Sequence, residues 1–112
     1  MNNKFEVLFL EQAIDFLESL DLKSRKKIYY NIDKAKLGLD PKLFKKLNDE
    51  IWEFRTKYNK NQYRLFAFWD KTEKSEILVI STHGIVKKVS KVPKTEIEKA
   101  IQIRKEYFEQ KD

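Results

Sequence analysis

A change in hydrophobic periodicity near residue 51 constrains the fold of this chain more than any other feature. From Trp52 to Tyr58, large apolar side chains alternate with charged ones, which is the pattern of a half-buried strand. Asn59-Lys60-Asn61 supplies turn residues, and residues 63–69 then divide between the two faces of a second strand. The pattern predicts a hairpin. One face of its second strand carries Tyr63, Leu65, Ala67 and Trp69, and the other carries Arg64, Phe66 and Phe68.

Before residue 51 the apolar spacing is mostly helical. Residues 4–9 are typical of a short strand, and apolar residues then recur at helical spacing from 10 to 20. Asp21 is suited to cap a second helix that ends near Gly38, because glycine readily takes the left-handed conformation at a helix end. Asp40-Pro41 repeats the start signal and predicts a short third helix. That helix would include Leu43, Phe44 and Leu47.

After the hairpin, the sequence predicts a polar turn, an inner strand and a final helix. The turn covers Asp70 to Ser75, and Ile77 to Ile80 is apolar on both faces, as in a strand covered on both sides. A basic connection is expected after Thr82-His83-Gly84. Thr95 and Glu98 have the spacing of a capping box for the last helix.

These elements predict one α+β domain over residues 1–112. The sheet should be small, mainly antiparallel, and packed against an N-terminal helical pair and a C-terminal helix. The chain has only two Gly and two Pro, and no linker-like segment divides it.

Composition excludes several classes of protein. The chain has no cysteine, which removes disulfides, thiolate nucleophiles and cysteine zinc sites. No apolar run approaches the ~20 residues needed to cross a membrane, and the N-terminus lacks a signal-peptide pattern. We therefore expect a cytoplasmic protein with no membrane partner. Because no HExxH, phosphate-loop or acidic metal motif is present, we expect neither metal nor cofactor.

The charge of the chain is segregated along the sequence. The formal net charge is +6, yet residues 1–22 carry five acids against one lysine. Basic residues concentrate in segments 23–37, 42–64 and 83–94. This distribution favours a polyanionic partner such as a nucleic acid.

Arg55 and Arg64 are the most informative candidate site residues, since they lie in the two strands of the predicted hairpin. Guanidinium groups bind phosphate through paired hydrogen bonds and can stabilise a charged transition state. We expect both arginines on the exposed face of the hairpin. Arginines at such positions more often serve solubility, so both interpretations stay open.

Five other residues are candidates with equally ordinary alternatives. Lys87-Lys88 lies in the predicted basic connection and can grip a substrate, although charge runs are usually solvated. His83, the only histidine, is a candidate acid or base or a structural residue. Trp52 and Trp69 can stack on bases but are better explained as core residues.

The ordered set of motifs over about residues 43 to 107 resembles the phage-derived HigB-like branch of the RelE/HigB toxins of type II toxin–antitoxin systems. The segments that carry the resemblance are Ile51-Trp52-Glu53-Phe54-Arg55, Tyr63-Arg64-Leu65-Phe66, residues 77–84, Lys87-Lys88 and residues 93–100.

The resemblance implies a RelE-like fold and a toxin that inhibits translation by cleaving mRNA in the ribosomal decoding site. The implied partners are the ribosome, mRNA and a cognate helix-turn-helix antitoxin. The implied reaction is a metal-independent transesterification that leaves a 2′,3′-cyclic phosphate. Arg55 and Arg64 would hold the phosphate, and Lys87 and Lys88 would contact RNA or assist proton transfer.

This sequence departs from the family at the residues that would identify a general base. Ile85 stands where an aromatic residue is common, and Trp52 and Glu53 replace the lysines of classical RelE. His83, a lysine with a shifted pKa or a ribosomal group can serve as the base. A noncatalytic antitoxin-binding corepressor and a general RNA-binding domain are the alternative functions.

Overall fold

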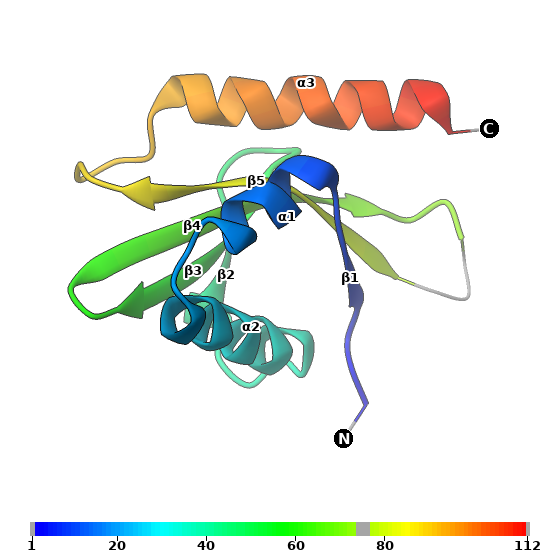
Figure 1. Cartoon of the computed structure of the whole chain (residues 1–112). Coiled ribbons are helices and arrows are strands. Elements are labelled where there is room, and N and C mark those ends of the chain that lie inside the picture. Colours follow the sequence, from blue (N-terminus) through cyan, green and yellow to red (C-terminus); the bar gives the residue numbers. More distant parts are fainter. Residues whose placement is uncertain (1, 74–76, 112) are drawn as a thin grey trace.

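The computed structural model describes residues 2–73 and 77–111 and contains one mixed sheet between two helical layers (Figure 1). Five strands are arranged in the order β1-β5-β4-β3-β2, with β1 parallel to β5 and the other neighbours antiparallel. The elements are β1 (Glu6–Phe9), α1 (Glu11–Glu18), α2 (Leu22–Lys36), η1 (Pro41–Leu43), β2 (Phe44–Lys46), β3 (Trp52–Tyr58), β4 (Asn61–Asp70), β5 (Leu78–Lys87) and α3 (Lys94–Gln110). The predicted α+β class is confirmed.

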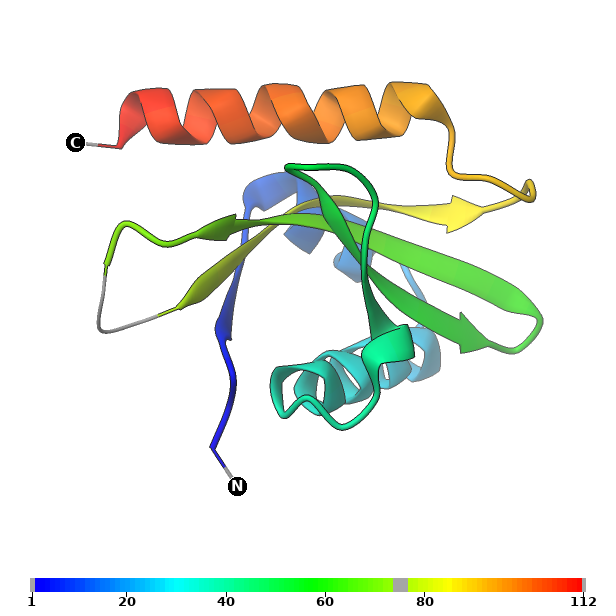
Figure 2. The ribbon, with the colours of Figure 1, turned by 180° about the vertical axis from the view of Figure 1, so that it is seen from behind.

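Each face of the sheet has its own hydrophobic core. Helices α1 and α2 cover one face, and α3 covers the other (Figures 1 and 2). On the first face Leu65 packs with Leu17 of α1 and Ile28 of α2. On the second, Phe66 and Phe68 pack with Ala100 of α3. Residues at even positions of β4 therefore face α3, and residues at odd positions face the helical pair.

The two-residue turn Asn59-Lys60 sets the register of the β3–β4 hairpin. Both residues have positive φ angles, 51° and 68°, as a type I′ turn requires. The turn joins the pair Tyr58 and Asn61, and counting back along both strands brings Arg55 opposite Arg64. The turn chemistry therefore decides that the two arginines meet.

The pairing of β4 with β5 contains an irregularity that changes which side chains share a face. Leu65 pairs with Gly84, whereas Ala67 pairs with Ser81, so β5 has one extra residue between these points. Gly84 also allows α1 to approach closely, because a Cβ atom there would overlap the ring of Phe16.

The predicted N-terminal helical pair is confirmed together with its capping signals. The Asp21 side chain accepts a hydrogen bond from the backbone N–H of Ser24, which lies 3.1 Å away. Gly38 follows α2 with a φ of 73°, the left-handed conformation expected at that end.

The short third helix was predicted too long. Only η1 is helical, with Asp40 accepting a hydrogen bond from the N–H of Lys42. Phe44 instead begins the edge strand β2, where its ring stacks on Phe54 at a centroid distance of 4.4 Å. Tertiary packing of this aromatic side chain on the sheet outweighs its helix-like spacing with neighbouring apolar residues.

Two further boundaries differ from prediction. The basic connection was expected directly after Gly84, but β5 continues to Lys87 because residues 62–65 of β4 pair with its second half. The Thr95–Glu98 capping box is wrong, since α3 already begins at Lys94 after Pro93 and has no side-chain cap. The predicted turn from Asp70 to Ser75 falls partly outside the described residues.

Candidate functional site

A basic depression lies at the hairpin, next to the start of the edge strand β2. Its volume is about 580 Å³. The lining residues come from η1, β2, β3 and β4: Lys42, Leu43, Lys45, Arg55, Thr56, Lys57, Gln62 and Arg64. Five of these eight side chains are cationic and none is a carboxylate, so the depression is suited to an anion.

The strand register explains why the basic side chains gather. Arg55 pairs with Arg64, and Lys57 pairs with Gln62, which in turn pairs with Lys87 of β5. Cross-strand partners project from the same face of a sheet. Lys57, Gln62 and Lys87 therefore form a row across three strands, next to the row that contains the two arginines. Lys87 extends the basic surface on the side of the sheet that α3 covers.

Arg64 is buried, which corrects the expectation that both arginines lie on an exposed face. Its side chain is 3% exposed, and its Nη2 donates a hydrogen bond to Gln62 Oε1 at 3.0 Å. Arg64 Nε lies 3.1 Å from Glu53 Oε1. This contact is an ion pair without hydrogen-bond alignment, since neither atom has a hydrogen-bond partner among the described residues. Burial lowers the pKa of Arg64, while Glu53 opposes the shift.

Glu53 links the two arginines, a role that the sequence reasoning missed. Its second carboxylate oxygen lies 3.8 Å from Arg55 Nε, and its side chain is only 7% exposed. Burial raises the pKa of Glu53, although Arg64, Arg55 and Lys87 act in the opposite direction. Arg55 remains accessible, with 38% of its side chain exposed. The pair thus consists of one fixed, buried guanidinium and one that solvent can reach.

His83 is held beneath α3 and does not line the depression. Its Nε2 lies 3.0 Å from Glu96 Oε1 of α3, and its Nδ1 lies 3.0 Å from Thr82 Oγ1. Because the carboxylate can only accept, we assign the ring hydrogen to Nε2. The ring stacks on Phe66 and is nearly inaccessible. Burial lowers the pKa of His83, so the neutral form predominates at neutral pH.

The remaining candidates occupy different environments. Lys88 follows the last residue of β5 and is exposed. Trp52 and Trp69 pack edge to face at 5.7 Å in an aromatic cluster around Phe44, as the core interpretation predicts.

Several lining residues were not recognised from the sequence. The period-two spacing of Glu53 and Arg55 already places them on one face, and this signal can identify the pair in advance. Lys42 and Lys45 were not identified as site residues because their segment was assigned to a helix. Gln62 carries no sequence signal of its own, since its position depends on the turn.

Within the described part of the chain, no cluster of three or more His, Asp or Glu side chains can hold a metal ion. No helix there is long and apolar enough to cross a membrane.

A protein-family model matches residues 15–105, which include the whole hairpin and most of α3. The model is described as phage derived protein Gp49-like (DUF891). No curated protein shows significant similarity to the chain.

Proposed function

The chain belongs to the Gp49-like family of phage-derived proteins, a RelE-like family associated with toxin–antitoxin systems, and we propose that it is the toxin of such a pair, acting as a ribosome-dependent mRNA endoribonuclease. The observation that carries this proposal is the basic depression in which Arg55 and Arg64 meet across the hairpin. A HigB-like toxin with a helix-turn-helix antitoxin as partner is the finer form of the proposal.

The proposed reaction is transesterification at a phosphodiester of mRNA. The ribose 2′-oxygen loses its proton to a base and bonds to phosphorus, and the bond from phosphorus to the 5′-oxygen breaks. The departing 5′-oxygen takes up a proton, which leaves a 2′,3′-cyclic phosphate and a 5′-hydroxyl. Arg55 and Arg64 bind the non-bridging oxygens, whose negative charge increases in the transition state. Lys87 and Lys88 contact the neighbouring RNA.

The arrangement around Glu53 supports a phosphate site that is ready before substrate arrives. A guanidinium held by packing and by an ion pair loses little freedom when it binds, so its electrostatic effect on the transition state is large. Arg64 is held in this way, whereas Arg55 can adjust to the incoming phosphate.

Several groups remain candidates for the proton acceptor. His83 would have to leave its contacts with Glu96 and Thr82 to reach a substrate. Glu53 is the carboxylate beside the arginines, but it would have to leave its buried contact with Arg64 to reach a substrate. A ribosomal group is the third candidate.

Ribosome dependence is proposed from the open form of the site. A shallow basic depression can bind a phosphate but does not by itself align the 2′-oxygen, phosphorus and 5′-oxygen. A second body that imposes this geometry on mRNA can supply much of the rate, because orientation contributes strongly to catalysis.

The decisive experiment combines induction of the chain alone with cleavage by the purified protein. Induction should stop growth and produce mRNA ends that primer extension maps within translated regions. The purified protein should cut mRNA on ribosomes much faster than free RNA, and cyclic-phosphate ends should appear at EDTA concentrations that leave ribosomes intact. Equal cutting of free RNA would replace the proposal with a self-sufficient nuclease.

A noncatalytic corepressor is the second candidate, because the same basic surface can bind operator DNA through an antitoxin. It would bind its antitoxin yet leave translation and mRNA intact in the induction experiment.

A further inference from the structure

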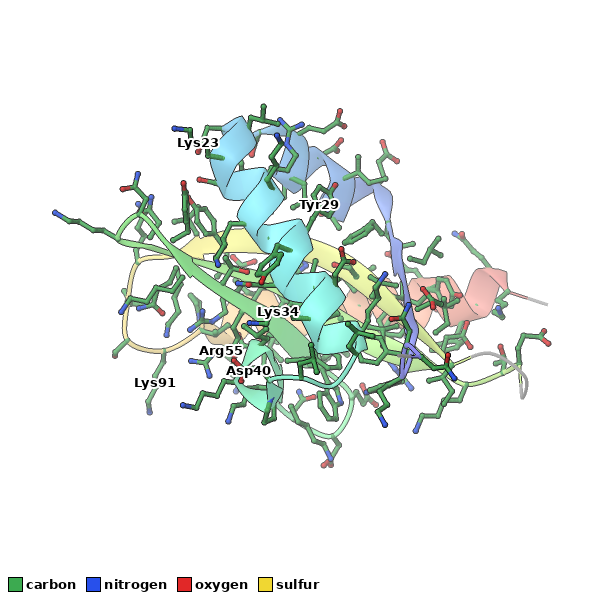
Figure 3. All side chains as sticks on the ribbon, turned by 90° about the horizontal axis from the view of Figure 1, so that it is seen from below. Lys23, Tyr29, Lys34, Asp40, Arg55 and Lys91 are labelled. Atoms are coloured by element: carbon green, nitrogen blue, oxygen red, sulfur yellow. The ribbon has the colours of Figure 1, made fainter. Side chains whose placement is uncertain are left out.

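Helix α2 carries a second basic surface that is separate from the lining of the depression. Lys23, Lys27, Tyr30 and Lys34 follow one another at spacings of four, three and four, so they form one stripe along the helix. We call this set the α2 stripe. It extends about 16 Å along the helix axis, at a rise of about 1.5 Å per residue. Figure 3 shows α2 in front of the sheet, with Lys23 and Lys34 near its two ends.

The α2 stripe is organised around an exposed aromatic ring. Tyr30 is 56% exposed. The Nζ atoms of Lys27 and Lys34 lie 5.0 and 5.6 Å from the centre of its ring. Cation–π contacts of this kind restrain the lysine side chains near the aromatic face.

The stripe borders the depression. Asn31 of α2 donates a hydrogen bond of 3.1 Å to Thr56 Oγ1, and Thr56 lines the depression. Lys27 and Lys34 precede and follow Asn31 by about one helical turn, so they flank this contact. The segment η1, whose Lys42 and Leu43 also line the depression, packs against α2 as well. The two basic surfaces lie on opposite faces of the sheet and meet at the edge of β3, where Thr56 and η1 lie.

We propose that the α2 stripe binds the backbone of the RNA strand that enters or leaves the depression, with Tyr30 as a stacking surface for one base. The proposal rests on the proposed function and adds an extended substrate path to its cleavage site. Ammonium groups held beside an exposed aromatic ring are suited to single-stranded RNA of varied sequence. The exposed apolar side chains of α2 that a protein partner would bury, Leu22 and Tyr29, lie on a different face of the helix.

The test measures binding of the purified full-length protein to single-stranded RNA oligonucleotides that carry 2′-O-methyl groups and so cannot be cleaved. One oligonucleotide, about four nucleotides long, fills only the depression, and another, about twelve, also reaches α2. The wild type should bind the longer RNA more tightly. At low salt, the variant Lys27→Ala/Lys34→Ala should bind the longer RNA roughly tenfold more weakly than the wild type does. The slope of log binding constant against log salt concentration should become shallower by about 1.4, because two phosphate contacts are lost.

The controls separate a local path from a general charge effect. Lys71→Ala/Lys105→Ala removes the same charge at exposed positions outside both surfaces and should keep the gain with length. Tyr30→Leu should weaken binding of the longer RNA roughly fivefold, whereas Tyr30→Phe should bind it as the wild type does. Arg55→Ala should weaken binding of both the short and the long RNA, because Arg55 lines the depression that both occupy.

Three results would overturn the α2 path. The first is an unchanged length dependence in the lysine variant, and the second is an equal loss for short and long RNA. The third is a loss of ribosome binding with no effect on the oligonucleotides, which would assign the stripe to ribosomal RNA. These results are independent of cleavage on ribosomes, so failure of the nuclease proposal remains distinguishable from failure of the path.

Discussion

Arg64 Nε lies 3.1 Å from Glu53 Oε1, and both side chains are almost completely buried on the sheet face that α3 covers. Two opposite charges at this depth depend on each other, because each one is costly to bury alone. The pair belongs both to the fold and to the candidate site, so a substitution in it affects both. Predictions about Arg64 must therefore separate stability from activity.

Arg64→Ala should lower the free energy of unfolding by about 3 kcal/mol, because it leaves the Glu53 carboxylate buried without its partner. The double variant Glu53→Leu/Arg64→Met should recover most of this loss, since an apolar pair can replace a buried ion pair. Urea denaturation measures both. The double variant, although stable, should still be inactive in ribosome-dependent cleavage. Activity in the double variant would show that the ion pair is not part of the functional site.

Arg55→Ala should change activity with little effect on stability, because the Arg55 side chain is partly exposed and its contact with Glu53 is long, at 3.8 Å. Loss of one transition-state phosphate contact costs ~2.7 to 4 kcal/mol, or roughly a hundred- to thousandfold in rate. Single-turnover cleavage of mRNA on ribosomes measures the effect. Lys105→Ala, at an exposed position of α3 outside the depression, is the matched control and should cleave within a fewfold of wild type.

His83→Gln should destabilise the chain while retaining most cleavage, because the ring fastens α3 to β5 through Glu96. Two lost hydrogen bonds predict a cost of about 1 to 3 kcal/mol. The pKa of His83 is lowered in the fold from its ordinary value of 6.5, so the unfolded chain takes up the proton first. Stability should therefore fall as pH drops below about 6.5, and this part of the slope should be absent in the variant. A hundredfold loss of cleavage in a folded His83→Gln protein would instead make the imidazole catalytic.

The far end of α3 provides a separate prediction for acid stability. Tyr107 donates a 2.6 Å hydrogen bond to Asp70 Oδ2, and Lys111 Nζ lies 3.1 Å from the same oxygen. Burial alone would raise the pKa of Asp70, but hydrogen bonds from Tyr107, Thr72 and Lys111 outweigh it and hold the pKa well below its usual range. This stabilisation is present above pH ~4 and is lost as pH falls towards the lowered pKa.

Asp70→Asn should therefore be less stable than wild type at neutral pH, and the difference should shrink as pH falls below about 4. Thermal melting followed by circular dichroism across this range measures it. Tyr107→Phe should cost about 1 kcal/mol near neutral pH, since it removes one hydrogen bond and keeps the ring packing. A constant difference at every pH would mean that the carboxylate charge does not contribute.

Periodicity and capping chemistry predicted most of the fold, because they act locally. Periodicity in residues 52–69 predicted the hairpin and which side chains of its second strand share a face, and Asp21 and Gly38 marked the ends of α2. Local signals failed where a distant partner decides the structure. Phe44 joins the sheet because it packs on Phe54, and α3 begins one residue before Thr95.

The candidate site was only partly predictable for a related reason. That Arg55 and Arg64 meet follows from the hairpin, so the sequence indicated the pair. Their unequal burial follows from the position of Glu53 and from the cover of α3, which no residue spacing reveals. The contribution of Lys42 and Lys45 depends on an edge strand that was assigned to a helix.

The extra residue in β5 between the pairs Leu65–Gly84 and Ala67–Ser81 has an evolutionary consequence. Successive side chains of a strand point to opposite faces of the sheet. One extra residue in a strand therefore reverses which face the odd-numbered and the even-numbered residues point to beyond it. In this chain it is an odd position, Lys87, that joins the arginine side of the sheet. If the same residues ran without this bulge, strict alternation from Ile80 would bring Lys88 to that side instead. A pair of adjacent lysines thus makes the basic surface tolerant of a one-residue shift in the register of β5, because either lysine then presents an ammonium group on that side.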